Sequence, residues 1–186
     1  RIWTQSNFGE DLIFAARGGN LFFWDATDAL TTRGVLLSSE SGASNVPTKV
    51  NTLLVSDNRF VFCFGTNVLG SSDIDPMLLR WSDQENAVNW TPSATNQAGD
   101  LRLSKGSEII TAIQGRQEIL VWTDSALYAL QYVGAPAVWG AQTVGENLSI
   151  ASPNTVAYAN GVAYWMSDNA FYLYDGVVKK MPCSVQ

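Results

Sequence analysis

The sequence has no histidine among its 186 residues and only two cysteines. Without histidine, a histidine-dependent catalytic triad and a histidine metal site are excluded, so acid–base chemistry would depend on carboxylates. Cys63 lies within an apolar run and far from Cys183, which indicates a buried thiol and no disulfide framework. We therefore expect no catalytic residues, no cofactor and no metal site, and we predict that the protein is not an enzyme.

Positive charge and long apolar runs are also scarce. The chain has 11 Lys and Arg against 17 Asp and Glu, a net charge of −6. Scattered basic residues do not form the clustered patch that binds phosphates, so no specific nucleic-acid binding is expected. No apolar run approaches the roughly 18 residues of a membrane-spanning helix, and no membrane partner is expected. The hydrophobic fraction of 46% is nevertheless sufficient for a core.

Residues 109–144 have the pattern of one complete four-stranded antiparallel unit. Short runs rich in β-branched and aromatic residues alternate there with residues that favour turns. Asp124-Ser125, between two such runs, suits the tight turn of a hairpin. No stretch of the chain has a sustained apolar period of 3.6 residues, so almost no helix is expected.

The unit recurs along the chain. Residues 163–174 match 119–130 without a gap, and residues 12–25 and 60–81 have the same shape. The positions taken as equivalent are Phe14, Phe62, Leu120 and Tyr164. They are spaced by roughly 45 to 60 residues, close to the repeat length of β-propeller blades. We predict an all-β chain of antiparallel four-stranded blades, a β-propeller or propeller fragment with about four blades.

The predicted organisation is one propeller-type domain over residues 1–186. Because the chain begins at Arg1 and stops after Pro182-Cys183 without a finished element, we expect it to be part of a longer protein. The blades are expected at approximately 1–40, 48–92, 101–146 and 154–186. In the second blade, residues 65–76 form an insertion between the middle strands. The strand-like run 87–90 is expected to close this blade. A polar linker with a short apolar stretch at 101–103 follows it.

One acidic concentration flanks the insertion, and it consists of Asp73, Asp75, Asp83 and Glu85. A calcium site needs several such oxygen ligands that converge on one point. Acidic pairs of this kind are common in surface loops, so a solvated loop is expected and not a metal site.

Tryptophan is abundant, with seven in the chain. Trp24, Trp81, Trp122 and Trp165 lie inside expected strands, where facing sheets bury large side chains. Trp90 and Trp139 lie at strand edges. These two could be exposed, which would make them candidates for binding a carbohydrate or for stacking on a base.

Several short stretches in the later part of the chain carry a resemblance beyond the blade pattern. They are Leu79-Arg80-Trp81-Ser82, Asn89-Trp90-Thr91-Pro92, Ala98-Gly99-Asp100-Leu101-Arg102-Leu103, Gly106-Ser107-Glu108-Ile109, Gly145-Glu146-Asn147, Ser152-Pro153-Asn154, Tyr164-Trp165-Met166-Ser167, Phe171-Tyr172-Leu173-Tyr174-Asp175-Gly176 and Met181-Pro182-Cys183. In this order and spacing they resemble the large β-propeller-bearing virion proteins of tailed phages, which include tail nozzle and tail tubular proteins.

The resemblance implies a structural component of a phage tail, in the nozzle or tail-tube region, assembled as a ring of copies around the DNA exit channel. The implied partners are other copies of the chain and the neighbouring tail and portal-adaptor proteins. The implied location is the virion, and the host cytoplasm during assembly. An acidic channel would let DNA slide without sticking, because it repels phosphate. The insertion at 65–76 is the expected contact with neighbouring copies.

Two alternatives stay open at this point. A glycan-binding or glycan-cleaving propeller would bring exposed carboxylates and aromatic side chains together at one rim. A host scaffold propeller that recruits other proteins would form a closed ring of blades within one gene product. The fold alone does not decide among these functions.

Overall fold

The computed structural model describes residues 2–182, and within them the chain is all-β. The strands form four antiparallel four-stranded sheets, which confirms the predicted fold class. One 3-10 turn, η1 (Leu37–Ser39), is the single helical element of the described residues. No helix in this part of the chain is long and apolar enough to cross a membrane.

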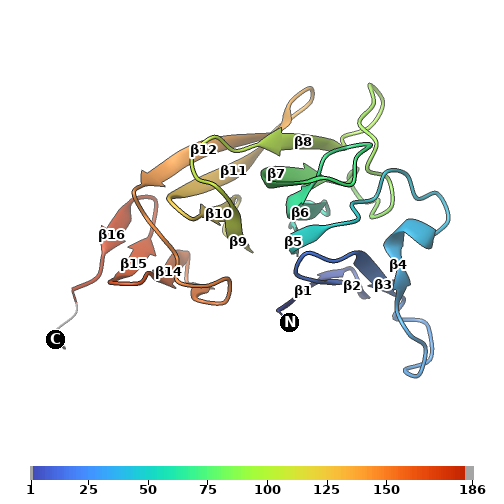
Figure 1. Cartoon of the computed structure of the whole chain (residues 1–186), viewed down its shortest axis with the longest axis horizontal. Helices are drawn as coiled ribbons and strands as arrows, with labels where there is room; N and C mark the ends of the chain where they lie inside the picture. The colour runs from blue at the N-terminus through green and yellow to red at the C-terminus, as the bar shows by residue number, and fades with distance from the viewer. Residues whose placement is uncertain (1, 183–186) are drawn as a thin grey trace. The chain divides into compact units, whose positions relative to one another are not determined.

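Each sheet is a simple meander in which neighbouring strands are consecutive in sequence (Figure 1). The first sheet contains β1 (Trp3–Phe8), β2 (Asp11–Ala16), β3 (Leu21–Trp24) and β4 (Val35–Leu36). The second contains β5 (Val50–Val55), β6 (Val61–Asn67), β7 (Ile74–Trp81) and β8 (Gly99–Arg102). The third contains β9 (Ile109–Gln114), β10 (Ile119–Thr123), β11 (Ala126–Gly134) and β12 (Val138–Glu146). The fourth contains β13 (Val156–Ala159), β14 (Val162–Met166), β15 (Phe171–Tyr174) and β16 (Val178–Lys180).

The chain divides into two compact units, Arg1–Leu103 and Ser104–Gln186, where the sequence predicted one domain. The first unit holds the first and second sheets, and the second unit holds the third and fourth. Two stacked sheets are sufficient to enclose a core of their own, because each contributes one apolar face.

The second sheet differs from the prediction in its last strand. β8 is Gly99–Arg102, paired with β7, and residues 87–90 form no strand of the sheet. The 87–90 run is instead bridged to Ser44, whose amide donates to the Val88 carbonyl at 3.0 Å. The predicted blade boundary at residue 92 is therefore wrong, and the predicted apolar stretch at 101–103 overlaps the closing strand.

Half of the residues 65–76 continue the two middle strands, so the inserted loop is shorter than predicted. β6 continues to Asn67 and β7 begins at Ile74, with a register shift between Phe64 and Thr66. Gly65, at the shift, has φ of +60° and would place a Cβ 2.7 Å from the Asn51 side chain, so only glycine fits there. The predicted insertion is thus a long hairpin whose tip is residues 68–73.

The first and second sheets pack face to face through one apolar core. In the first sheet Ile13, Ala15 and Leu21 are buried, and in the second Val61 and Cys63 are buried against them. Removing each large aliphatic side chain from water stabilises the fold by about 1.5 to 3 kcal/mol.

Side-chain hydrogen bonds join the first strands of these two sheets. Thr4 Oγ1 accepts from the Leu53 amide, and Ser6 Oγ accepts from the Val55 amide, both at 3.1 Å. These bonds link the hydroxyl face of β1 to the backbone of β5, so polar groups at the sheet-to-sheet contact are satisfied.

In the second unit, the third and fourth sheets enclose a second core. Its centre is the pair Trp122 and Trp165, whose rings lie edge to face with centroids 5.4 Å apart and planes 65° apart. Leu127 and Ala163 are fully buried beside them. Edge-to-face geometry is favourable for aromatic rings, so this pair contributes beyond its buried area.

Cys63 provides a test of the first core. Burial raises the pKa of its thiol far above the ordinary value, although the nearby charge of Arg80 acts in the opposite direction. In a Cys183→Ser variant, which leaves Cys63 as the one thiol, we expect no reaction with maleimide under native conditions and one adduct in denaturant, measured by intact mass. Equal rates of native and denatured labelling would contradict a closed core.

A small network of hydrogen bonds, which we call the clasp, joins the segment before β9 to the β10–β11 turn. Asp124 accepts from the Ser107 amide at 2.8 Å and from the Ser107 hydroxyl at 2.5 Å. Thr123 Oγ1 donates to the Lys105 carbonyl at 3.0 Å. Gly106 lies between them with φ of +117°, and a Cβ there would lie 2.5 Å from Asp124 Oδ1.

This clasp predicts a pH-dependent contribution to stability. Desolvation of Asp124 raises its pKa, but hydrogen bonds from Ser107 and the Glu108 amide outweigh this, so the net pKa is lowered. A lowered pKa adds stability above the unfolded-state value of about 3.9, and that stability is lost as pH falls below it. We expect Asp124→Asn to lower the free energy of unfolding by under about 1 kcal/mol at pH 7, because the carboxyl group is largely solvated. Near pH 2 we expect no difference from wild type.

The matched control is Asp168→Asn, which removes one negative charge from the corresponding turn of the fourth sheet. Urea unfolding across the acid range measures both variants. The clasp would not be the source of this stability if Asp124→Asn lost the same free energy of unfolding at every pH. The same conclusion would follow if the stability of Asp168→Asn depended on pH in the same way.

Candidate functional site

Three of the four acidic side chains singled out in the sequence lie in separate contacts. Asp75 Oδ2 pairs with Arg102 Nε at 2.6 Å, and Glu85 pairs with Arg59 at 3.4 Å. Asp83 Oδ1 accepts from the Gln97 amide at 2.8 Å. Within residues 2–182, no three His, Cys, Asp or Glu side chains are grouped so as to hold a metal ion.

The long β6–β7 hairpin, predicted as a contact with neighbouring copies, has a well-supported tip. The Asn67 side chain accepts from the Thr48 and Lys49 amides and donates to the Ser71 carbonyl at 2.8 Å. Two aliphatic side chains at the tip, Val68 and Leu69, are exposed to solvent, and so is Ile74 at the start of β7. The hairpin therefore offers a fixed apolar tip, with no catalytic group among these side chains.

Both tryptophans considered as candidates for exposure, Trp90 and Trp139, are buried. Trp90 is 1% exposed and donates from Nε1 to the Ala87 carbonyl at 2.8 Å. Trp139 is 5% exposed and lies edge to face with Tyr132, which is its partner across β11 and β12. The suggested exposure is wrong for both, because cross-strand and local contacts cover side chains that the sequence places at strand ends.

Of the four tryptophans predicted to be in the core, Trp81, Trp122 and Trp165 are buried. Trp24 is half-buried, and its Nε1 donates to the Thr32 carbonyl at 3.1 Å. The strongly exposed tryptophan is Trp3, with 56% of its surface accessible, which the sequence did not single out.

Trp3 belongs to an aromatic face on the first sheet, which we call the first-sheet outer face and define by Trp3, Phe14 and Phe22. Phe14 is paired with Phe22, and their rings stack with centroids 5.5 Å apart. The Trp3 ring lies 6.2 Å from that of Phe14. Because Ile13 and Ala15 alternate with Phe14 and pack on the second sheet, these rings are on the opposite side of the sheet.

A similar face lies on the fourth sheet. We call it the last-sheet outer face and define it by Tyr164, Met166 and Phe171. Met166 is paired with Phe171, and all three side chains are exposed, Phe171 most of all at 48%. Trp165 alternates with them and packs into the core on the other side.

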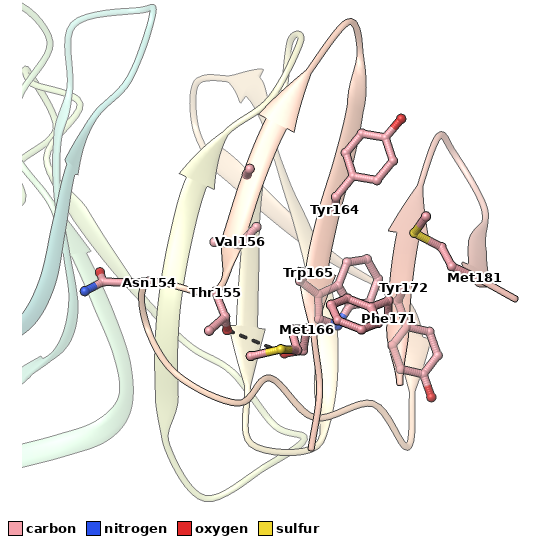
Figure 2. A pocket seen from close by; sticks show the side chains of 10 residues that line it. Asn154, Thr155, Val156, Tyr164, Trp165, Met166, Phe171, Tyr172 and Met181 are labelled. Carbon is pink, nitrogen blue, oxygen red and sulfur yellow. Dashed lines mark hydrogen bonds between the residues drawn. The ribbon is translucent and has the colours of Figure 1, made fainter. Parts of the chain in front are cut away.

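A shallow groove of about 220 Å³ lies against these strands (Figure 2). Tyr164, Met166, Phe171 and Met181 are among its lining residues, so its character is largely apolar. The Thr155 hydroxyl donates to the Met166 carbonyl at its margin. The groove thus has aromatic and thioether surface and few hydrogen-bonding groups, as expected for packing and not for chemistry.

Charge near the last-sheet outer face is internally paired. Lys179 Nζ contacts Asp175 Oδ2 at 2.6 Å. The hydrogen bond from Lys179 lowers the pKa of the Asp175 carboxyl below its ordinary range. Arrangements of this type shield charge and do not provide a binding patch for phosphates.

The fold and the two outer faces define a class, that of all-β proteins built from propeller-type four-stranded sheets. No protein-family model and no curated protein sequence matches the chain. Solved structures do match its fold. One is the extracellular domain of a protein described as a hybrid two-component system, BT4673, of B. thetaiotaomicron, with a TM-score of 0.60 and 15% identity.

That match covers 98% of this chain and 22% of the other, so the chain spans about a fifth of the length of the matched structure. A second match is the computationally designed Ika4 protein, with a TM-score of 0.52 and 13% identity. It covers 96% of this chain and 88% of the designed one. At these identities the similarity is one of fold.

Proposed function

We propose that the chain is a non-enzymatic structural component of a phage tail, in the nozzle or tail-tube region, and that it acts by assembly around the DNA exit channel. The observation that carries the proposal is the presence of two outward apolar sheet faces on a scaffold of packed sheets. Exposed apolar patches of this kind mark interaction surfaces. The quoted resemblance to phage virion proteins supplies the particular assembly.

The residues of that resemblance have structural roles that suit an assembly protein. Tyr164-Trp165-Met166-Ser167 spans most of β14 and supplies both the core tryptophan and two side chains of the last-sheet outer face. Asp175-Gly176 forms the turn after β15, where Gly176 has φ of +107°. The same short stretch thus builds the sheet and presents its outward surface.

The proposed partners are other copies of the chain and the neighbouring tail and portal-adaptor proteins, and the proposed location is the virion. The β6–β7 hairpin tip, with its exposed Val68 and Leu69, is a second contact available to those partners. The net charge of −6 supports passage of DNA without binding, because like charge repels the phosphate backbone. We do not propose the glycan alternative further, because Trp90 and Trp139 are buried and three of the four acidic side chains lie in separate contacts.

Immunogold electron microscopy of particles from a phage that carries this reading frame tests the location. Antibodies raised against the 186-residue chain are expected to label the tail end from which DNA leaves. Antibodies pre-adsorbed with the same chain are the control. Label confined to lysate protein, with none on purified particles, would contradict the proposed function.

A further inference from the structure

Within each unit, two sheets stack so that an apolar face of one covers an apolar face of the next. Ile13 and Ala15 of the first sheet pack on Cys63 of the second. Trp122 of the third sheet packs on Trp165 of the fourth. The first-sheet outer face and the last-sheet outer face are the opposite sides of the first and fourth sheets. On them Trp3, Tyr164, Met166 and Phe171 are exposed, whereas Phe14 and Phe22 are half-buried.

These two faces have the chemistry of stacked sheets. The first-sheet outer face carries the Phe14–Phe22 ring pair, which joins two neighbouring strands and stacks with centroids 5.5 Å apart. Leaving the exposed apolar surface of these faces in water costs free energy in proportion to its area. A covering layer is therefore favoured.

The occupant that fits best is another β-sheet. The groove on the last sheet, about 220 Å³ and open, is smaller than the roughly 300 to 1,000 Å³ of ordinary small-molecule pockets. The nearby Lys179 is paired with Asp175, and Lys180 is the one further lysine on that strand, which falls short of the clustered positive charge that a polyanion requires. The exposed side chains project from the middle strands β14 and β15, so they suit packing on the sheet face and not strand addition at an edge.

We propose that the last-sheet outer face of one copy packs on the first-sheet outer face of a second copy, as a head-to-tail contact between sheets. The chain itself supplies both sides, since each face is apolar and aromatic and continues a stack already present within its unit. This inference deepens the proposed function and rests on its claim that copies assemble. It identifies the two surfaces through which the copies associate.

A head-to-tail contact uses two different surfaces, so each copy has one of each and association continues to a ring or a filament. A face-to-same-face contact would instead stop at a dimer. This difference makes the proposal testable with single substitutions on exposed residues. Met166→Glu places a charge on the last-sheet outer face, and Trp3→Glu places one on the first-sheet outer face.

The experiment is analytical ultracentrifugation of the 186-residue chain over a range of concentrations. Wild type is expected to form species larger than a dimer, and each variant is expected to weaken association by about tenfold or more, because a charge would be buried without a partner. A mixture of the two variants is expected to form dimers and nothing larger, since each variant keeps one intact face.

The control is Val177→Lys, in the β15–β16 turn, which is 62% exposed and does not line the groove. It is expected to associate like wild type, and circular dichroism checks that every variant is folded. A wild-type chain that stays monomeric, a loss caused by Met166→Glu alone, or an equal loss in Val177→Lys would each overturn the proposal. If one of these results were found while the antibodies still labelled phage tails, the proposed function would be supported and only the head-to-tail contact would be rejected.

Discussion

Replacing Trp122 with alanine is expected to lower the free energy of unfolding by about 4 kcal/mol, the typical cost of removing a large aromatic side chain from a core. Trp122 is fully buried on β10, and its ring contacts Trp165 from the facing sheet. The substitution would remove the packing between the two sheets of the second unit and leave a cavity that Leu127 and Ala163 are too small to fill.

Urea unfolding followed by far-ultraviolet circular dichroism measures this effect. At a dilution where the chain is monomeric, Trp3→Ala is the matched control, because it removes the same side chain from an exposed position on a strand. We expect the control to change stability by less than about 1 kcal/mol. If both variants lose the same stability, or Trp122→Ala loses less than the control, the second core is not organised around the tryptophan pair.

Replacing Arg80 with methionine is expected to cost about 2 kcal/mol or more, because buried carbonyl groups lose their donor. Arg80 is only 2% exposed, and its guanidinium donates to the Asn45 carbonyl at 2.7 Å and to the Trp90 and Asn67 carbonyls at 3.5 and 3.4 Å. Burial lowers the pKa of the guanidinium, while the nearby Cys63 and Asp100 act to raise it. The side chain thus holds two loops, at Asn45 and Trp90, to the second sheet and also bonds the end of β6 at Asn67.

The control for Arg80→Met is Arg102→Met, on the adjacent strand β8. Arg102 pairs with Asp75 at an exposed position, so its loss should cost under about 1 kcal/mol. Arg80→Lys adds a further comparison, since a single ammonium group does not reproduce the planar fork of donors. Equal stability of the Arg80 and Arg102 methionine variants would contradict a structural role for the buried guanidinium.

The third and fourth sheets were the most accurately predicted part of the fold. The gapless match between 119–130 and 163–174 corresponds to equal hairpin registers, with Leu120 opposite Ala129 and Tyr164 opposite Leu173. Short turns between strands rich in β-branched and aromatic residues are local signals, so the sequence contains most of the information that sets them.

The first copy of the repeat is displaced by one residue. Its hairpin turn spans 16–20, where the third sheet has 123–126. A one-residue difference turns every side chain to the other face of the sheet. Phe14 therefore points away from its neighbouring sheet, whereas Leu120, taken as its equivalent, packs against one.

The last strand of the second sheet was missed because its pattern is weak. Gly99–Arg102 is short, begins with glycine and carries two charged residues. The glycine is required because a Cβ at Gly99 would lie 2.5 Å from the Trp81 ring, a contact that exists only in the folded sheet. The 87–90 run has better strand composition, but its backbone hydrogen bonds go to Ser44, Asp83 and the Asn86 side chain and not to β7.

Neither outer face could be found from the sequence. An alternating strand indicates two faces, but whether a face is covered depends on which other sheet lies against it, and that is a property of the tertiary structure. The exposed Trp3 and the buried Trp90 and Trp139 illustrate the same limit. The sequence placed the aromatic residues correctly on strands or at strand ends. Their exposure depends on contacts with residues that are distant in the sequence.

The central claim is that this chain acts by assembly around a channel, and electron microscopy of the full-length product of its reading frame tests it most directly. Negative-stain images are expected to contain rings of several subunits with an open axial channel. The same preparation carrying Trp3→Glu is expected to contain fewer rings if the outer faces join the copies. A monodisperse monomer without rings at any concentration would contradict assembly by the protein itself.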